Sequence, residues 1–367
     1  MRVLILSANT GGGHNSAAKA VKEALEHHQA ECATADTLSF VSELVSDIVC
    51  KGHNNLYKYF PELFGVGYRF AENHSPKLLY DSMTLGAKKL SVFIKEGQFD
   101  AIVCTHVFAS MMVTEAHKKY DLAVPQYFVS TDYTCYPGVS TIDAEGIFMP
   151  AEGLRQEYLD GGADESRLIV ANGIPILPVF RHPPEKGEAR NRLGLPETGR
   201  IVLLCCGSMG AGNIHRVVPD FAAQLPEDAL LVVVCGHNER TYQQLTENPP
   251  ERTVVVGFTD RMVDYMAAAD VCVSKPGGLS ITEMLSLKVP MVLVLAVPGC
   301  ETRNLDFLER QELAVRAETW EDAAVVAADL LRHPEKLTAL RERMGETDFS
   351  SGAETIATVV VKRNEQK

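Results

Sequence analysis

The sequence predicts an α/β protein of two doubly wound, Rossmann-like domains, with parallel sheets facing an interdomain cleft. Short apolar runs alternate with helical patterns along the whole chain, which is typical of βα units in parallel sheets. A proline-rich stretch divides these runs into two sets. The length of 367 residues suits two domains of about 150 to 180 residues, each with its own core.

The expected strands fall into two groups on either side of the prolines. They lie at residues 3–8, 30–35, 101–104, 127–130, 146–149 and 168–171, and then at 201–206, 230–235, 253–256, 271–274 and 291–295. Four prolines between residues 173 and 184 indicate an extended linker, with a hinge near 175–185. We therefore expect domains at 1–178 and 179–345, and a closing helix within 346–367. Ligands should bind at the carboxyl ends of the strands, in the cleft between the domains.

Composition excludes several classes of protein. The net charge of −13 argues against nucleic-acid binding, because a phosphate backbone selects a basic surface. Nine cysteines without a CxxC pair indicate reduced thiols of a cytosolic protein, not disulfides or zinc ligands. Residues 1–6 are too short for a signal-peptide core and predict a first strand. No apolar segment approaches the roughly 18 residues that a membrane span needs.

The most informative segment is 274–283, with the sequence SKPGGLSITE, directly after an apolar run. A strand that turns into a helix through Gly277, Gly278, Leu279 and Ser280 leaves main-chain N–H groups and a helix dipole facing an anion such as a diphosphate. Glu283, one turn into a helix expected to begin at Ser280, would accept hydrogen bonds from ribose hydroxyls. The alternative is a capping box between Ser280 and Glu283 that needs no ligand.

A second glycine-rich turn follows the first expected strand. Residues 9–16 read NTGGGHNS and precede a strong helical pattern, so Gly12 and Gly13 allow a ligand to approach the main chain closely. His14 would lie at the positive end of that helix, where the dipole favours a neutral imidazole that can accept a proton. The alternative is a histidine that caps the helix or hydrogen-bonds the main chain.

Four motifs occur in a characteristic order: TGGGH at 10–14, STDYT at 130–134, SKPGGLS at 274–280 and PGCETRN at 298–304. Together they resemble the monogalactosyldiacylglycerol synthase and processive diacylglycerol glucosyltransferase family of glycosyltransferase family 28. The resemblance covers nearly the whole chain and implies a GT-B fold with inverting chemistry. It implies that His14 is the base, that Glu283 binds ribose, and that Glu301 and Asn304 face the donor sugar.

The chain departs from the family pattern at two places. Cys300 stands where many members have glutamine, and residues 135–138 read CYPG where plant members have histidine and tryptophan. These changes bear on which sugar and which acceptor the chain would use.

Further candidates lie at other expected strand ends. Gly207 and Ser208 belong to another glycine loop that could contact the diphosphate, or could serve only tight packing. Gly257 and Phe258 are similar to the place where the family holds uracil, and a core phenylalanine is the alternative. Asp132 could orient His14, contact the acceptor or cap a helix.

No Asp-x-Asp pair occurs in the sequence, so we expect donor binding without a metal or other cofactor. Helix ends and Lys275 would then balance the charge of the diphosphate.

Residues 51–95 combine basic and aromatic side chains. They hold seven Lys or Arg, three acidic residues and eight aromatic residues, which suits contact with an anionic membrane surface. The alternative is a helical insertion packed on its own domain.

The combined expectation is a UDP-sugar-dependent hexosyltransferase, a glycolipid synthase that moves a hexose from a UDP-hexose to diacylglycerol or a glycosyl-diacylglycerol. Residues 1–178 would bind the acceptor and residues 179–345 the UDP-sugar. The enzyme would be cytoplasmic and peripherally associated with the inner face of the cell membrane. The alternatives are a UDP-sugar epimerase of the same fold and a UDP-sugar-sensing regulatory protein.

Overall fold

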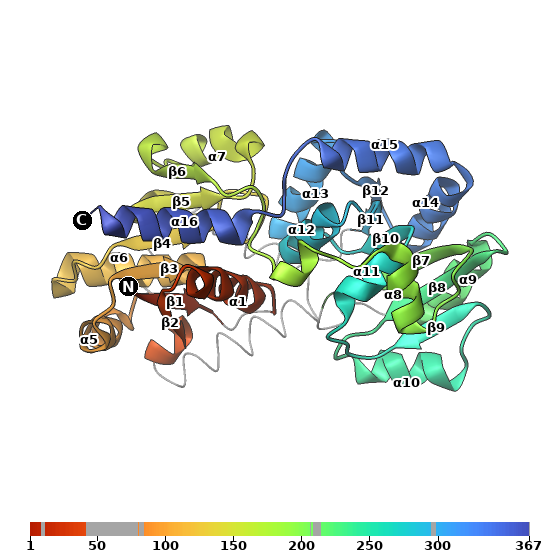
Figure 1. Ribbon diagram of the computed structural model, residues 1–367, viewed down its shortest axis with the longest axis horizontal. Coiled ribbons are helices and arrows are strands. Elements are labelled where there is room, and N and C mark those ends of the chain that lie inside the picture. Colours follow the sequence, from red (N-terminus) through yellow and green to blue (C-terminus); the bar gives the residue numbers. More distant parts are fainter. Residues whose placement is uncertain are drawn as a thin grey trace. The chain divides into compact units, whose positions relative to one another are not determined.

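The computed structural model describes residues 1–8, 12–41, 80, 84–205, 207, 214–294 and 299–366. Most of the basic aromatic segment, at 51–79 and 81–83, lies outside the described residues, as does Ser208. The chain forms two compact units (Figure 1). Unit 1 comprises Met1–Leu177 with Phe349–Lys367, and unit 2 comprises Pro178–Asp348.

Unit 1 is built on a parallel sheet with the strand order β2-β1-β3-β4-β5-β6. Its strands are β1 (Arg2–Ser7), β2 (Glu31–Asp36), β3 (Ala101–Cys104), β4 (Gln126–Val129), β5 (Gly146–Met149) and β6 (Leu168–Val170). Its helices are α1 (Gly12–His27), α5 (Ala87–Gly97), α6 (Val107–Tyr120), α7 (Arg155–Asp160) and α16 (Gly352–Glu365).

Alternating apolar residues in β1 give this sheet two buried faces. Val3 and Ile5 pack against α1 and α16 on one face, whereas Leu4 and Leu6 pack against α5 and α6 on the other. Burial on both faces explains why each strand is a continuous apolar run and not an alternating pattern. The α1 and α16 helices lie side by side although they come from opposite ends of the chain (Figure 1).

Unit 2 contains a second parallel sheet, with the order β12-β11-β10-β7-β8-β9. Its strands are β7 (Arg200–Cys205), β8 (Ala229–Val234), β9 (Thr253–Val256), β10 (Val271–Ser274), β11 (Met291–Val294) and β12 (Val315–Ala317). Its helices are α8 (Lys186–Leu193), α9 (Val218–Gln224), α10 (Glu239–Glu247), α11 (Met262–Ala268), α12 (Gly278–Ser286), α13 (Cys300–Arg310), α14 (Trp320–Arg332) and α15 (Pro334–Gly345).

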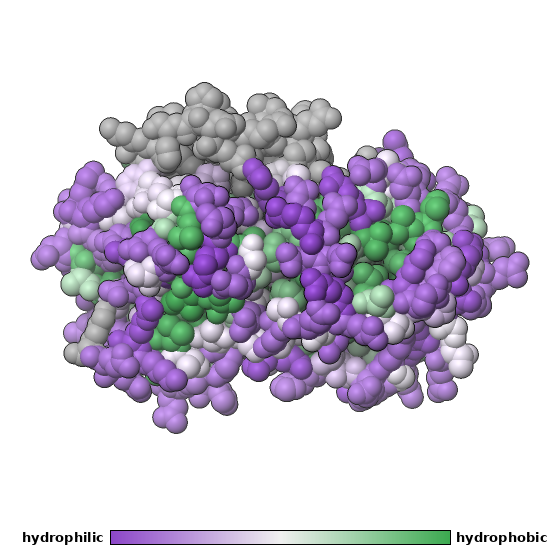
Figure 2. All heavy atoms as spheres, turned by 90° about the horizontal axis from the view of Figure 1, so that it is seen from above, coloured by the Kyte–Doolittle hydropathy of each residue, from purple (hydrophilic) through white to green (hydrophobic). Residues whose placement is uncertain are grey.

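The core of unit 2 lies between this sheet and helices α9 and α14, which contribute Phe221, Ala324 and Ala328. The face of the molecule seen in Figure 2 is mostly hydrophilic, with apolar side chains in separate patches. No helix among the described residues is both long and apolar enough to cross a membrane.

The two parallel α/β sheets confirm the predicted fold class. All eleven expected strands are present, and their ends differ from the expected positions by one residue at most. Strand β12 was not predicted. It has three residues with Arg316 at its centre, and this side chain reaches Asp306, Glu309 and Glu318, so the sequence shows no apolar run there.

The end of the chain forms α16, as expected from the sequence. Its three consecutive valines have weak helix propensity, but Ile356, Ala357 and Val360 are fully buried in the core of unit 1. Tertiary packing therefore determines the helix at this position.

Candidate active site

Both sheets reverse their strand order beside the first strand of the unit. In unit 1 the chain runs from β1 outward to β2 and then returns to β3 on the other side, and in unit 2 β7 lies between β8 and β10. Loops that leave two such neighbours in opposite directions open a crevice at the carboxyl ends of the strands. Most of the predicted site residues lie beside these two reversals, whereas Gly257 and Phe258 follow β9, two strands from β7.

In unit 1, His14 occupies the first turn of α1, beside the ends of β3 and β4. Its Nδ1 atom lies 3.1 Å from the main-chain oxygen of Thr105 and 2.8 Å from Oγ1 of Thr131. The alternative of a histidine bonded to the main chain is therefore correct for one ring nitrogen. Nε2 makes no hydrogen bond to any described residue, so this nitrogen is available to a substrate.

The surroundings of His14 keep the imidazole neutral. Burial lowers the pKa of His14 to about 4, against a smaller opposing effect of the Thr105 carbonyl. At neutral pH a proton on Nδ1, donated to Thr105, leaves the lone pair of Nε2 free. The arrangement suits a group that accepts a proton from a bound hydroxyl.

Asp132 is connected to His14 through two intervening side chains. The Tyr136 hydroxyl donates a short hydrogen bond to Oδ2 of Asp132, and Tyr136 Oη lies 3.1 Å from Thr131 Oγ1. Asp132 forms no described contact with His14 and caps no described helix. The Tyr136 and Thr131 hydroxyls connect it to the imidazole, and sequence reasoning did not identify these two residues.

A second histidine lies against His14. The rings of His14 and His106 meet edge to face, with centroids 4.5 Å apart. Nδ1 of His106 accepts the N–H of Phe108 (3.1 Å) at the start of α6, which fixes the ring. His106 follows Thr105, directly after β3. A histidine just after an expected strand is the sequence feature from which this residue could have been identified.

In unit 2, helix α12 begins at Gly278, two residues earlier than predicted from Ser280. Gly277 is the N-cap residue in an extended conformation, with φ −75° and ψ 128°. Gly277 has no side chain that could form a capping hydrogen bond, and the helix begins at the next residue. Ser280 is therefore inside the helix, and the proposed capping box between Ser280 and Glu283 does not form.

This helix start leaves donors available. The N–H groups of Gly278, Leu279 and Ser280 meet no acceptor among the described residues, whereas Ile281 N–H donates to the Gly277 oxygen (3.0 Å). Three adjacent main-chain donors at the positive end of a helix form a receptive position for a phosphate group.

Lys275 supplies positive charge beside these donors. Its Nζ atom pairs with Oε1 of Glu301 in α13, and both side chains are largely buried, with 15% and 8% exposed. The Lys275 side chain passes over Gly207, which follows β7 with a φ of +72°; a Cβ there would lie 3.0 Å from Lys275 Cε. Gly207 therefore makes room for the lysine.

Asn304 also contacts the loop that contains Lys275. Its Nδ2 atom donates to the Pro276 carbonyl (2.9 Å), and the side chain is fully buried. Glu301 and Asn304, which the resemblance assigns to the donor sugar, thus both contact the loop before α12. Their contact with a sugar stays a prediction.

Glu283 lies on α12, one turn after the free N–H groups, and its carboxyl group forms no described hydrogen bond or ion pair. Burial, with a smaller contribution from the nearby Cys205 thiol, raises the pKa of Glu283 to about 8. A carboxyl group in such surroundings gains from hydrogen-bond donors supplied by a ligand.

Phe258 is not a core residue. It follows Gly257 at the end of β9, is 60% exposed, and stacks on His237, which follows β8. The ring centroids are 4.1 Å apart and the planes differ by 17°. An exposed pair of stacked rings at the carboxyl ends of β8 and β9 can hold a flat base. His237 was not identified from the sequence.

The structure thus brings Gly12, Gly13, His14 and Asp132 to the crevice of unit 1. It brings Gly207, Lys275, Gly277, Glu283 and Glu301 to the crevice of unit 2, with Gly257 and Phe258 two strands away.

Two family models cover these regions. Residues 14–176 match the family described as Monogalactosyldiacylglycerol (MGDG) synthase, and residues 201–304 match the Glycosyltransferase family 28 C-terminal domain. The first match begins at His14 and the second ends at Asn304.

The chain is 26% identical to the processive diacylglycerol beta-glucosyltransferase of Bacillus pumilus (strain SAFR-032), over 99% of this chain and 95% of that protein. Its fold is similar to that of Acinetobacter baumannii MurG, with a TM-score of 0.67 at 15% identity over 98% and 99% of the two chains. UDP-GlcNAc 2-epimerase from Neisseria meningitidis, bound to UDP-GlcNAc, gives a TM-score of 0.62 at 12% identity over the full length of both chains. These likenesses establish a GT-B fold.

The raised pKa of Glu283 predicts how stability depends on pH. Between the ordinary value of 4.5 and about 8, the folded chain holds a proton that the unfolded chain has released, so stability falls as pH rises through this range. Glu283→Gln removes this loss. The variant should match the wild type at pH 5 and exceed its stability at pH 9 by at least about 2 kcal/mol. Thermal and urea unfolding at both pH values measure this, and an equal difference at pH 5 and pH 9 would contradict it.

Proposed function

Because the chain belongs to the monogalactosyldiacylglycerol synthase and diacylglycerol glucosyltransferase group of glycosyltransferase family 28, we propose that it is a glycolipid synthase. It transfers a hexose from a UDP-sugar to diacylglycerol or a glycosylated diacylglycerol, with inversion at the anomeric carbon. The observation that carries this proposal is His14, held through Nδ1 with Nε2 free at the carboxyl edge of the first sheet.

The reaction needs one base. Nε2 of His14 takes the proton of the acceptor hydroxyl as the oxygen attacks the anomeric carbon. The bond between that carbon and the diphosphate oxygen breaks on the opposite face, and UDP leaves with the bonding electrons. One displacement inverts the configuration. The Thr105 carbonyl stabilises the imidazolium that forms, because it accepts the Nδ1 proton.

Unit 2 would bind the donor. The N–H groups of Gly278, Leu279 and Ser280 hold the diphosphate and stabilise the charge that develops as UDP leaves. Lys275 adds a cation, Glu283 accepts the ribose hydroxyls, and Phe258 with His237 stacks on uracil. Glu301 and Asn304 hold the loop and contact the sugar. These groups supply positive potential without a metal ion.

The acceptor requires contact with a membrane surface, and the described part of the basic aromatic segment supports it. Lys88 and Lys89 are exposed on α5, next to exposed apolar side chains: Leu85 (69%), Val92 (48%) and Phe93 (38%). Cations beside apolar side chains suit the interface of an anionic bilayer. We propose that the enzyme acts peripherally at the inner face of the cell membrane.

His14→Ala should lower kcat for glycolipid formation by about 100-fold or more and leave UDP affinity within about twofold, because His14 acts on the acceptor. Thin-layer and mass analysis of lipids from an assay with a UDP-hexose and diacylglycerol vesicles measures turnover. His333→Ala, an exposed histidine of unit 2, is the control. Wild-type turnover in His14→Ala would remove His14 from the mechanism and direct attention to Asp132. Sugar isomerisation without a lipid product would favour an epimerase, and UDP-sugar binding without turnover would favour a sensor.

UDP should bind in the presence of EDTA, because main-chain donors and Lys275 take the place of a metal ion. Glu283→Ala should weaken binding by about 1 to 3 kcal/mol through loss of the ribose hydrogen bonds. Isothermal calorimetry measures both, and Glu342→Ala, an exposed glutamate of α15, is the matched control. Loss of UDP binding on chelation would contradict the metal-free site.

Replacing Lys58, Arg69, Lys88 and Lys89 by Gln should detach the protein from anionic vesicles and leave UDP binding unchanged. Each cation contributes about 1 kcal/mol, so partitioning should fall by about two to three powers of ten, and added salt should have the same effect. Vesicle sedimentation measures the bound fraction. The control removes the same charge outside the segment, at Lys19, Lys119, Lys336 and Arg343. Equal binding by both variants at low and high salt would show that the segment is a packed insertion.

A further inference from the structure

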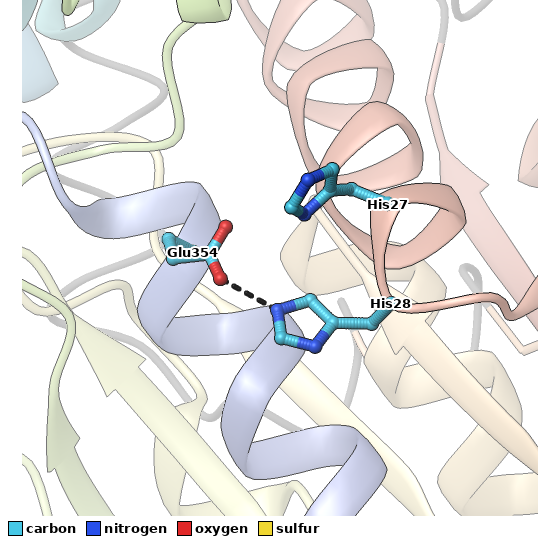
Figure 3. Close-up of side chains that lie close together, drawn as sticks. All are labelled: His27, His28 and Glu354. Atoms are coloured by element: carbon cyan, nitrogen blue, oxygen red, sulfur yellow. Dashed lines mark hydrogen bonds and ion pairs between the residues drawn. The ribbon is translucent and has the colours of Figure 1, made fainter.

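Two histidines and a glutamate form a cluster in unit 1, at the far end of α1 from His14. His27 is the last residue of α1, His28 follows it, and Glu354 lies in the first turn of α16. Their ligand atoms all lie within 4.8 Å of one another. Figure 3 shows both imidazole rings projecting from the end of α1 toward Glu354. Across the described ranges, no other group of three His, Cys, Asp or Glu side chains comes this close.

Packing between two helices holds the cluster in place. Leu25 of α1 and Ile356 of α16 are fully buried in the same core cluster, next to the histidines and the glutamate in the sequence. Nε2 of His28 lies 2.5 Å from Oε1 of Glu354, and the rings of His27 and His28 are 5.9 Å apart at nearly right angles. The cluster remains open to water, because the His28 and Glu354 side chains are 30% and 37% exposed.

We propose that His27, His28 and Glu354 bind a divalent transition-metal ion, with Zn²⁺ as the best match. Two imidazoles and one carboxylate are a common ligand set for zinc, and water completes the coordination. Ligand atoms about 2.0 to 2.1 Å from a tetrahedral ion are roughly 3.3 Å apart. The ligand atoms lie within 4.8 Å of one another, and rotation of the exposed His27 and of Glu354 would bring them to this spacing.

An ion pair between His28 and Glu354 accounts for two of the three residues and leaves His27 unexplained. The second imidazole turns the pair into a group of three ligand atoms that face one another. The exposed pair of His333 and Asp329, with 3.0 Å between Nδ1 and Oδ1, shows the contrast, because no second histidine lies beside it.

The ion would link α16 to the end of α1. Helix α16 belongs to unit 1 although residues 178–348 of unit 2 come before it. A metal that joins His27 and His28 to Glu354 would hold α16 against α1. His14 lies 13 residues from His27 on the same helix, which is about 20 Å along its axis. The metal therefore stabilises the unit and takes no part in the transfer reaction.

The test uses the full chain without a histidine tag, stripped with EDTA and dialysed. Titration with Zn²⁺ should show one ion per chain and a rise in Tm. His27→Gln keeps the His28–Glu354 pair and removes one ligand, so Zn²⁺ affinity should fall by about 100-fold and the rise in Tm should disappear. Glu354→Gln should behave in the same way. His333→Gln, the matched control, should bind Zn²⁺ like the wild type.

Three results would overturn the proposal. The first is equal Zn²⁺ affinity in the wild type and His27→Gln. The second is no stoichiometric binding by the wild type. The third is a sulfur shell in the X-ray absorption spectrum of the zinc-loaded wild type, which would place the ion on cysteines; the proposal predicts two imidazole ligands and no sulfur. The X-ray measurement needs no variant and stays decisive if a substitution impairs folding.

Discussion

The reversal of strand order beside the first strand of each sheet is the constraint on which the rest of the structure depends. In a parallel sheet all carboxyl ends lie along one edge, and at the reversal the loops separate and leave main-chain groups uncovered. In unit 1 the reversal between β1 and β3 brings His14 against Thr105 and His106. In unit 2 the reversal between β7 and β10 brings Gly207 under Lys275, beside the start of α12. In the proposed reaction, the same topology would supply a proton acceptor in one unit and an anion-binding helix end in the other.

Burial shifts the pKa of one titratable group in each unit. Burial lowers the pKa of His14 and raises the pKa of Glu283, so both groups are held neutral by their surroundings at neutral pH. A neutral imidazole can accept a proton, and a neutral carboxyl group costs less to bury than a charged one until ribose hydroxyls reach it. Lys275, in the loop before α12, and Glu301 of α13 are largely buried and balance each other's charge. In the proposed reaction, these neutral groups and the balanced pair would meet the charge that arrives with the UDP-sugar and develops during transfer.

Much of this arrangement could be predicted from the sequence, because parallel strands buried on both faces are continuous apolar runs. The apolar runs predicted eleven strands. The glycine-rich turns that follow three of these strands predicted that His14, Gly207 and Gly277 lie at strand ends. Contacts between distant loops could not be predicted. Tyr136 and Thr131 join Asp132 to His14 only in the folded unit, and His237 meets Phe258 because β8 and β9 are neighbours. The predicted start of α12 at Ser280 was wrong, because the chain already turns into the helix at Gly277 and Gly278. His27 and His28 are adjacent in the sequence, but Glu354 is 326 residues away from His28, and no local pattern connects them.

The most direct test of the central claim is the anomeric configuration of the first glycolipid formed from a UDP-α-hexose and diacylglycerol, determined by proton NMR of the purified product. One displacement with His14 as the base predicts a β-linked sugar and no α-linked product. An α-linked glycolipid would require a second displacement or a retaining mechanism and would contradict the assignment of a single base. Release of free hexose without any glycolipid would contradict the lipid acceptor.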